Sequence, residues 1–170
     1  SGRQAGRARR QCSAMGAIML AVGGFLAALP LTAAQAEAAR VILEWSGHPI
    51  PEHPVILALQ AGGLGPLAIG LLAVGAVGIA PVCEEVLFRG VVQDAVQNTT
   101  GRIWPAIIVS AVIFGLVHVP QPHAIVPLAT LGILLGLVRV ATGRLWAVCL
   151  LHALFNARTI VLVLCGATNT

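Results

Sequence analysis

The sequence PVCEEVLFRG, residues 81–90, places two adjacent glutamates and an arginine directly after the uncharged stretch 64–83. At the centre of a helix in lipid, an Asp, Lys or Arg costs roughly 2.5–3.5 kcal/mol on insertion scales, and Glu should be comparable. A chain this apolar is not expected to carry three such groups unless they face a partner or a water-filled cavity. This stretch is therefore the candidate functional centre.

The spacing of these three residues gives them different surroundings on a helix. Positions four apart share a face, whereas neighbouring residues differ by about 100°. Glu85 and Arg89 are therefore expected to pair, with the acid first, whereas Glu84 points to another face. One carboxylate is then held in place and the other is left for chemistry. The alternative is that all three residues only form a polar lock between helices.

Composition indicates an integral membrane protein. Of the 170 residues, 58% are hydrophobic and 9% are charged, whereas about 25% are charged in soluble domains. The ten basic residues are all arginines, and four of them fall within the first ten positions. The net charge of +4 therefore reports membrane orientation, and no nucleic acid is expected as a partner. The four cysteines have no C-x-x-C spacing, which is typical of free thiols.

The predicted fold is an all-α, polytopic transmembrane bundle of about five spans. A basic cytoplasmic N-terminus at 1–14 precedes an apolar stretch at 15–34, which is long enough to cross a ~30 Å hydrocarbon core. Its basic start and its small residues near position 35 also fit a signal-like segment. Residues 35–62 are expected to form an external loop, in which 36–45 could be an interfacial helix. Four more spans are predicted within 64–165, at 64–97, 103–119, 124–140 and 145–165.

The loop and turn residues add two expectations. The arginines at 102 and at 139–144 fall on the same side as the basic N-terminus, which satisfies the positive-inside rule with that side cytoplasmic. The external loop carries His48 and His53, which are expected to be solvated because no cysteine or acidic framework of a metal site accompanies them.

Two later spans also carry polar side chains that need partners in lipid. His118 follows Phe114 by one turn, and His152 shares a helix face with Asn156. Taken singly, each group is typical of interhelical hydrogen bonding. Together with Glu84 they form a set that suits hydrolysis, because one His or Glu can activate water while the others bind metal or stabilise an oxyanion. By residue counting the two histidines lie at different depths, so the helices must tilt or kink for them to meet.

The three motifs EExxxR, FxxxH and HxxxN occur in that order on three helices. They resemble the motifs of the CPBP family of intramembrane proteases, also called the ABI family. This family includes the type II CAAX prenyl endopeptidases and bacterial proteins linked to bacteriocin processing or self-immunity. The resemblance covers about residues 64–165, and the motif residues are Glu84, Glu85, Arg89, Phe114, His118, His152 and Asn156.

The resemblance implies a helix bundle around a polar cavity, in the cytoplasmic (inner) membrane of a prokaryote. It implies a peptidase acting on a membrane-associated protein or peptide, and whether that substrate is lipidated stays open. Glu84 and His118 would activate the attacking water. His152 and Asn156 would support the oxyanion or a metal site. The residues expected to give structural support are Glu85, Arg89 and Phe114.

A zinc cofactor stays open at this stage. Glu84, His118 and His152 would supply three ligands to Zn²⁺ and leave a fourth position open. A metal-free mechanism, in which the Glu–His pair alone acts as the general base, is the alternative.

Other functions can be compared with the same residues. The chain has no H-E-x-x-H motif, Asp94 is its only aspartate, and Ser110, the only serine within a predicted core span, lacks a G-x-S-G setting. These features disfavour the other intramembrane protease classes. A proton- or ion-coupled transporter with Glu84 and His118 as a relay is an alternative, although no convincing internal repeat accompanies it. A non-catalytic, bacteriocin-immunity-type membrane protein is another.

Overall fold

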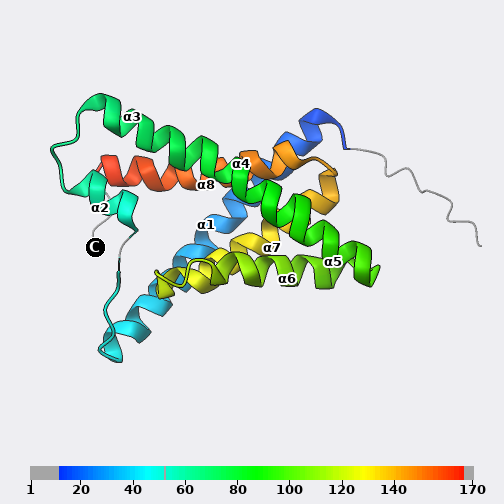
Figure 1. Cartoon of the computed structure of the whole chain (residues 1–170), viewed down its shortest axis with the longest axis horizontal. Helices are drawn as coiled ribbons and strands as arrows, with labels where there is room; N and C mark the ends of the chain where they lie inside the picture. Colours follow the sequence, from blue (N-terminus) through cyan, green and yellow to red (C-terminus); the bar gives the residue numbers. More distant parts are fainter. Residues whose placement is uncertain (1–11, 52, 167–170) are drawn as a thin grey trace, which may run out of the picture.

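The computed structural model describes residues 12–51 and 53–166, and within them all regular structure is helical (Figure 1). The all-α prediction is therefore confirmed. The elements are α1 (Ala14–Trp45), α2 (Pro54–Gln60), α3 (Pro66–Val74), the π-helical η1 (Gly75–Ile79), α4 (Ala80–Glu85), the π-helical η2 (Val86–Val92), α5 (Gln93–Thr100), α6 (Ile103–Leu116), the 3₁₀ turn η3 (Pro122–Ala124), α7 (Ile125–Thr142) and α8 (Leu145–Leu164).

The lengths and compositions of these helices make the chain an integral membrane protein. Among the residues that the structure describes, four helical runs are long and apolar enough to cross a membrane, namely Ala14–Trp45, Pro66–Thr100, Pro122–Thr142 and Leu145–Leu164. The remaining predicted span, at 103–119, is shorter than expected, because α6 has only 14 residues. At 1.5 Å per residue it is about 21 Å long, less than the ~30 Å hydrocarbon core.

Helix α1 differs from the expected arrangement of the N-terminal region. A span at 15–34 and a separate interfacial helix over 36–45 were expected, but one helix of 32 residues covers both. The reason is local, since 31–45 contains no glycine or proline and is rich in alanine and glutamate, which are good helix formers. Within the expected external loop, Pro54–Gln60 is also helical.

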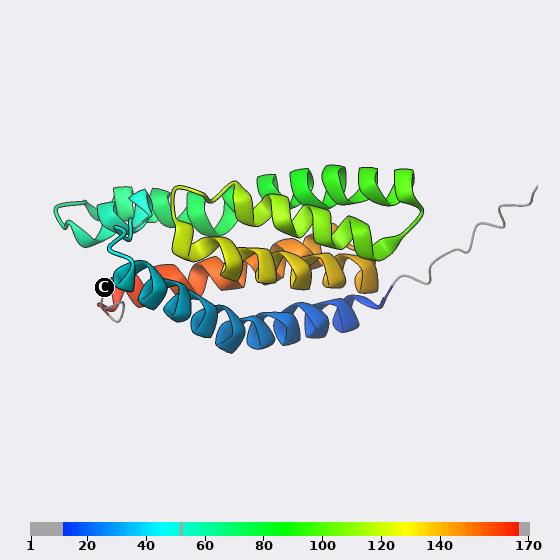
Figure 2. The same ribbon diagram turned by 90° about the horizontal axis from the view of Figure 1, so that it is seen from below.

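The helices form three layers (Figure 2). Helix α1 forms one outer layer and packs against α7 and α8 in the middle, and α3 to α6 lie on the other side. Alanines at positions 17, 21 and 28 of α1 are fully buried, and such small residues allow helices in a membrane to approach closely. The large core side chains are Phe88, Phe114, Leu131, Leu135 and Leu151.

The run from Pro66 to Thr100 is one continuous helix in which two π-helical segments flank α4. Glu84 and Glu85 are the last residues of α4, immediately before η2 begins. Segments of π-helix are rare, and they are frequent at functional sites because the wider turn redirects side chains and backbone groups. Pro81, which removes one backbone hydrogen bond from the helix, therefore lies in a stretch where the helical winding changes on both sides of the glutamates.

Glycine is required where α6 meets the start of α7. A Cβ on Gly115 would lie 2.6 Å from the carbonyl oxygen of Ile125 and 2.9 Å from the Cβ of Ala129. We expect Gly115→Ala to lower the free energy of unfolding by about 1–3 kcal/mol, the usual cost of overpacking. Denaturant unfolding in detergent micelles measures this change.

The control for this prediction is Gly70→Ala on the exposed face of α3, where an added Cβ meets nothing within 4 Å. That substitution is expected to be neutral or slightly stabilising, because alanine is the better helix former by about 1 kcal/mol. Equal effects of the two substitutions would show that the contact between α6 and α7 is not tight.

Candidate active site

A cavity of about 460 Å³ lies between α2, α3, α4, α8 and the segment that joins α6 to α7. Most of its walls are apolar, and its polar lining includes side chains from all three sequence motifs. The motif residues on its lining are Glu84, Phe114, His118, His152 and Asn156. The expected convergence of three distant parts of the sequence is therefore present.

The short α6 explains how histidines from different helices reach one cavity. This helix ends at Leu116, and His118 lies in the turn that follows it. His118 is therefore not carried to the far end of a full-length span. His152 lies in the first half of α8, and both imidazole rings contact the ring of Phe114, with centroids 5.3 Å and 5.6 Å away.

Behind the cavity wall lies a buried network centred on Glu85. Its Oε1 accepts a hydrogen bond from Arg89 Nη1 at 2.9 Å and another from His152 Nδ1 at 2.7 Å. Arg89 also donates from Nη2 to the carbonyl of Gly132 at 3.1 Å, and its guanidinium lies over the ring of Phe114. Glu85 and Arg89 are both fully buried. The pair expected from their spacing is present and is joined to α7 and α8.

Glu84 has the opposite environment. Its side chain is 31% exposed, lines the cavity, and has its Oε2 3.8 Å from His152 Nε2. That distance is too long for a hydrogen bond. The carboxylate of Glu84 is therefore open to the cavity, whereas the carboxylate of its neighbour Glu85 is buried and hydrogen-bonded to Arg89 and His152.

Hydrogen bonds also define the tautomers of the two motif histidines. His118 Nδ1 lies 2.8 Å from the carbonyl oxygen of Phe114, and a carbonyl only accepts, so Nδ1 carries the proton. By the same reasoning His152 Nδ1 donates to Glu85. In each neutral ring Nε2 is then the basic nitrogen, and for His152 that nitrogen lies on the side of Glu84.

Asn156 is held by a backbone carbonyl that the helix cannot satisfy itself. In η1 the N–H of Ala80 bonds to the carbonyl of Gly75, five residues earlier. The next bond in this register would run from residue 81 to Ala76, but Pro81 has no N–H. Asn156 Nδ2 donates to the Ala76 carbonyl at 2.9 Å instead. The amide therefore ties α8 to the π-helical segment η1, which precedes Glu84.

The fit of a metal can be judged from the donor side chains. Within residues 12–51 and 53–166, no group of three or more His, Cys, Asp and Glu side chains is arranged to hold a metal ion. In particular, Glu84, His118 and His152 do not form the three-ligand set considered from the sequence. No catalytic step below is therefore routed through a metal.

His53 is a cavity residue that the sequence did not reveal. It was expected to be solvated, and its side chain does keep substantial exposure, but it also lines the cavity together with Val55 and Ile56 of α2. Burial lowers the pKa of its imidazole below the usual 6.5, and the nearby His118 lowers this pKa further, while Glu84 acts in the opposite direction. The only local signal was the dipeptide His53-Pro54, since proline favours the first turn of a helix and the residue before it is the cap.

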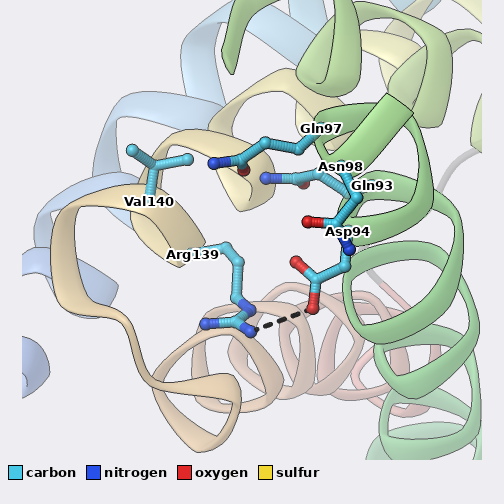
Figure 3. Close-up of a pocket in the computed structure, with 6 residues that line it drawn as sticks. All are labelled: Gln93, Asp94, Gln97, Asn98, Arg139 and Val140. Atoms are coloured by element: carbon cyan, nitrogen blue, oxygen red, sulfur yellow. Dashed lines mark hydrogen bonds and ion pairs between the residues drawn. The ribbon is translucent and has the colours of Figure 1, made fainter. Parts of the chain in front are cut away.

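A second, smaller cavity of about 270 Å³ lies towards the other end of the bundle, between α5 and α7 (Figure 3). Figure 3 shows the carboxylate of Asp94 facing the guanidinium of Arg139, and the two are 3.4 Å apart. Carboxamides of Gln93, Gln97 and Asn98 form the rest of its polar lining. This cavity contains none of the motif residues.

Comparison with known proteins identifies the family. A family profile described as type II CAAX prenyl endopeptidase Rce1-like matches residues 66–158, more than half of the chain. The chain is also 27% identical over 97 residues to the Bacillus subtilis (strain 168) protein named "Putative membrane peptidase YdiL". That match covers 57% of this chain and 39% of the relative, so the chain spans well under two thirds of the relative's length. No solved structure matches the chain significantly.

The matched stretch 66–158 contains every residue of the three motifs. It also contains most of the cavity lining, including the walls formed by α3, α4 and α8. This chain therefore belongs to the type II CAAX prenyl endopeptidase Rce1-like family.

Proposed function

We propose that this protein is an intramembrane endopeptidase that hydrolyses peptide bonds of a membrane-associated protein or peptide. The observation that carries the proposal is the open carboxylate of Glu84, which shares one cavity with the imidazoles of His118 and His152. Membership of the Rce1-like family supports the same reaction class. A carboxylate without a hydrogen-bond partner, such as that of Glu84, costs free energy in a lipid-embedded chain, and a purely structural role does not offset that cost.

In the proposed mechanism Glu84 and His118 activate the attacking water. The Glu84 carboxylate accepts a proton from the water, and Nε2 of His118, the basic nitrogen of its ring, accepts a second hydrogen bond that orients it. Water held in this geometry attacks the carbonyl carbon of the scissile peptide bond, and the carbonyl oxygen becomes an oxyanion. When this tetrahedral intermediate collapses, the carbonyl re-forms, the C–N bond breaks, and the leaving amine takes up the proton removed from the water. The cavity walls limit the entry of further water.

His152 and Asn156 support the oxyanion in this proposal. His152 Nε2 lies 3.8 Å from Glu84 Oε2, so the proton taken by Glu84 passes to His152 only after the two atoms approach to hydrogen-bonding distance. The buried Glu85 would stabilise the imidazolium through its 2.7 Å bond to Nδ1. The protonated Nε2 then faces the developing negative charge. Asn156 uses one amide hydrogen on Ala76, which holds its side chain in place beside the cavity.

The setting of the site is also part of the proposal. Leu71, Leu72 and Leu128 give the cavity apolar walls that suit a substrate delivered within the membrane. The excess of arginines at the N-terminus supports a cytoplasmic location for that end, and the proposed location of the protein is the inner membrane of a prokaryote. Whether the substrate carries a lipid is tested by presenting the same peptide with and without one.

We expect hydrolysis to survive metal removal, because the described side chains form no set of three metal ligands. The measurement is turnover before and after treatment with 1,10-phenanthroline, together with the zinc content of wild-type protein and of His118→Ala. Turnover and zinc content that both fall on chelation and return with added Zn²⁺ would contradict this prediction and support a metal site at Glu84, His118 and His152.

The reaction class is tested by reconstituting the chain in liposomes with membrane-anchored peptides and identifying products by mass spectrometry. Discrete internal cleavage supports the proposal. Proton or ion flux through the wild-type protein without any cleavage would favour a transporter in which Glu84 and His118 form a relay. The absence of both activities would favour a non-catalytic, immunity-type protein.

A further inference from the structure

Helix α2 forms part of the wall of the candidate active site. It lies beside α8 and below α3 in Figure 1, and it contacts α8. Its N-cap residue, His53, lines the same cavity as Glu84 and His118. The cavity is also lined by Val55 and Ile56 in the first turn of the helix. This segment lies before residue 66, outside the part of the chain that contains the family motifs.

The local structure of α2 determines which nitrogen of His53 is available. His53 is the N-cap of the helix, and its Nδ1 accepts a hydrogen bond from the N–H of Val55 at 3.2 Å. A ring nitrogen that accepts carries no proton, so Nε2 carries the proton of the neutral ring. The neutral ring of His53 therefore has the opposite tautomer to the rings of His118 and His152, whose Nδ1 atoms donate.

The surroundings of His53 keep it in that neutral form. Its pKa is lowered first by burial and then by the nearby His118, with Glu84 opposing them. At neutral pH the ring is thus uncharged and has one N–H to donate. Three of the cavity histidines therefore differ in what they present: His152 and His118 have basic Nε2 atoms, and His53 has a donor N–H.

We propose that His53 binds substrate in this site, with its Nε2–H donating a hydrogen bond to a backbone carbonyl of the bound peptide. This inference rests on the proposed peptidase function. A peptide in the cavity brings carbonyl oxygens that lose their water, and each needs a donor. The part of the lining supplied by α3 and η1 consists of leucines, glycine and alanine, which provide no side-chain donor. The imidazole on α2 provides one.

Two substitutions separate substrate binding from helix capping. Asn is among the best N-cap residues, so His53→Asn keeps the cap and removes the Nε2 donor. His53→Gln keeps an amide N–H at about the distance of Nε2 and removes the short cap acceptor. A role in substrate binding predicts that KM rises about three- to tenfold in His53→Asn, with kcat little changed, and that His53→Gln recovers part of the loss.

A purely structural role predicts the opposite order, with His53→Gln the worse variant and a lower melting temperature. The matched control is His48→Asn, because His48 is an exposed loop histidine that bonds to Ser46 and is absent from the cavity lining. Its KM is expected to equal that of the wild type. An unchanged KM in His53→Asn, or a KM change that follows melting temperature, overturns the proposal.

Glu84→Gln run in the same assay keeps this result distinct from the proposed function. If Glu84→Gln is inactive and His53→Asn has a wild-type KM, only the role of His53 is lost. If Glu84→Gln cleaves as well as the wild type, the proposed function itself is wrong.

Discussion

Glu84→Gln is expected to lower kcat for peptide hydrolysis by about 10²–10⁴-fold, the usual contribution of a general base. The carboxylate lines the cavity and lies 3.8 Å from Nε2 of His152, beyond hydrogen-bonding distance, so an amide of the same shape fits without loss of a hydrogen bond. What it cannot do is accept a proton from water. The measurement is kcat with a quenched fluorescent peptide in liposomes, together with the melting temperature, which is expected to stay unchanged.

The matched control is Asp94→Asn, the same exchange of acid for amide in the second cavity. Asp94 is paired with Arg139 at 3.4 Å and is 43% exposed, and it lies among none of the motif residues. Its kcat is expected to match the wild type. A Glu84→Gln variant that keeps a tenth or more of the wild-type kcat would remove this carboxylate from the base role.

The positions of the charged and polar residues in the sequence predict the buried ion pair and the shared cavity. Glu85 and Arg89 are four apart on a helix, and that spacing alone predicts the 2.9 Å pair. His118, His152 and Glu84 each need a partner in lipid, and one shared cavity meets that need for all three. The helical class follows from apolar runs of span length.

The winding of the helices is not predictable in the same way. Pro81 indicates a bend, but whether the chain absorbs it as a kink or as π-helix depends on what can satisfy the carbonyl of Ala76. That partner is Asn156, which is 80 residues away in sequence. The spacing of residues in the sequence therefore does not predict that Asn156 stabilises the π-helical segment η1.

The N-terminal third departs from the prediction for two further reasons. Hydropathy places the end of the first span near residue 34 because polar residues begin there, but helix propensity carries α1 on to Trp45. His53 lies in a short helix with no periodic pattern, and its position beside the cavity depends on the contact between α2 and α8. Neither the contact between α2 and α8 nor the place of His53 at the cavity can be deduced from composition.

The second large effect concerns the buried network behind the site. Arg89→Met is expected to lower the free energy of unfolding by about 3–5 kcal/mol, because it leaves the Glu85 carboxylate buried without its cation. Only the bond from His152 would remain to that carboxylate. Methionine fills much of the arginine volume, so the effect is one of charge rather than of an empty space. Denaturant unfolding in detergent micelles measures it.

Arg139→Met is the matched control, since Arg139 is also an arginine on a core helix and also pairs with an acid. Its pair with Asp94 is longer, at 3.4 Å, and both side chains are partly exposed, so its loss is expected to cost no more than about 1 kcal/mol. The double variant Glu85→Gln/Arg89→Met should recover part of the stability lost in Arg89→Met, because the buried charge is gone while an acceptor for His152 remains. Equal costs for Arg89→Met and Arg139→Met would mean that the Glu85 carboxylate is not ionised in the bundle. In that case His152 would lack the anion that the proposed mechanism requires behind it.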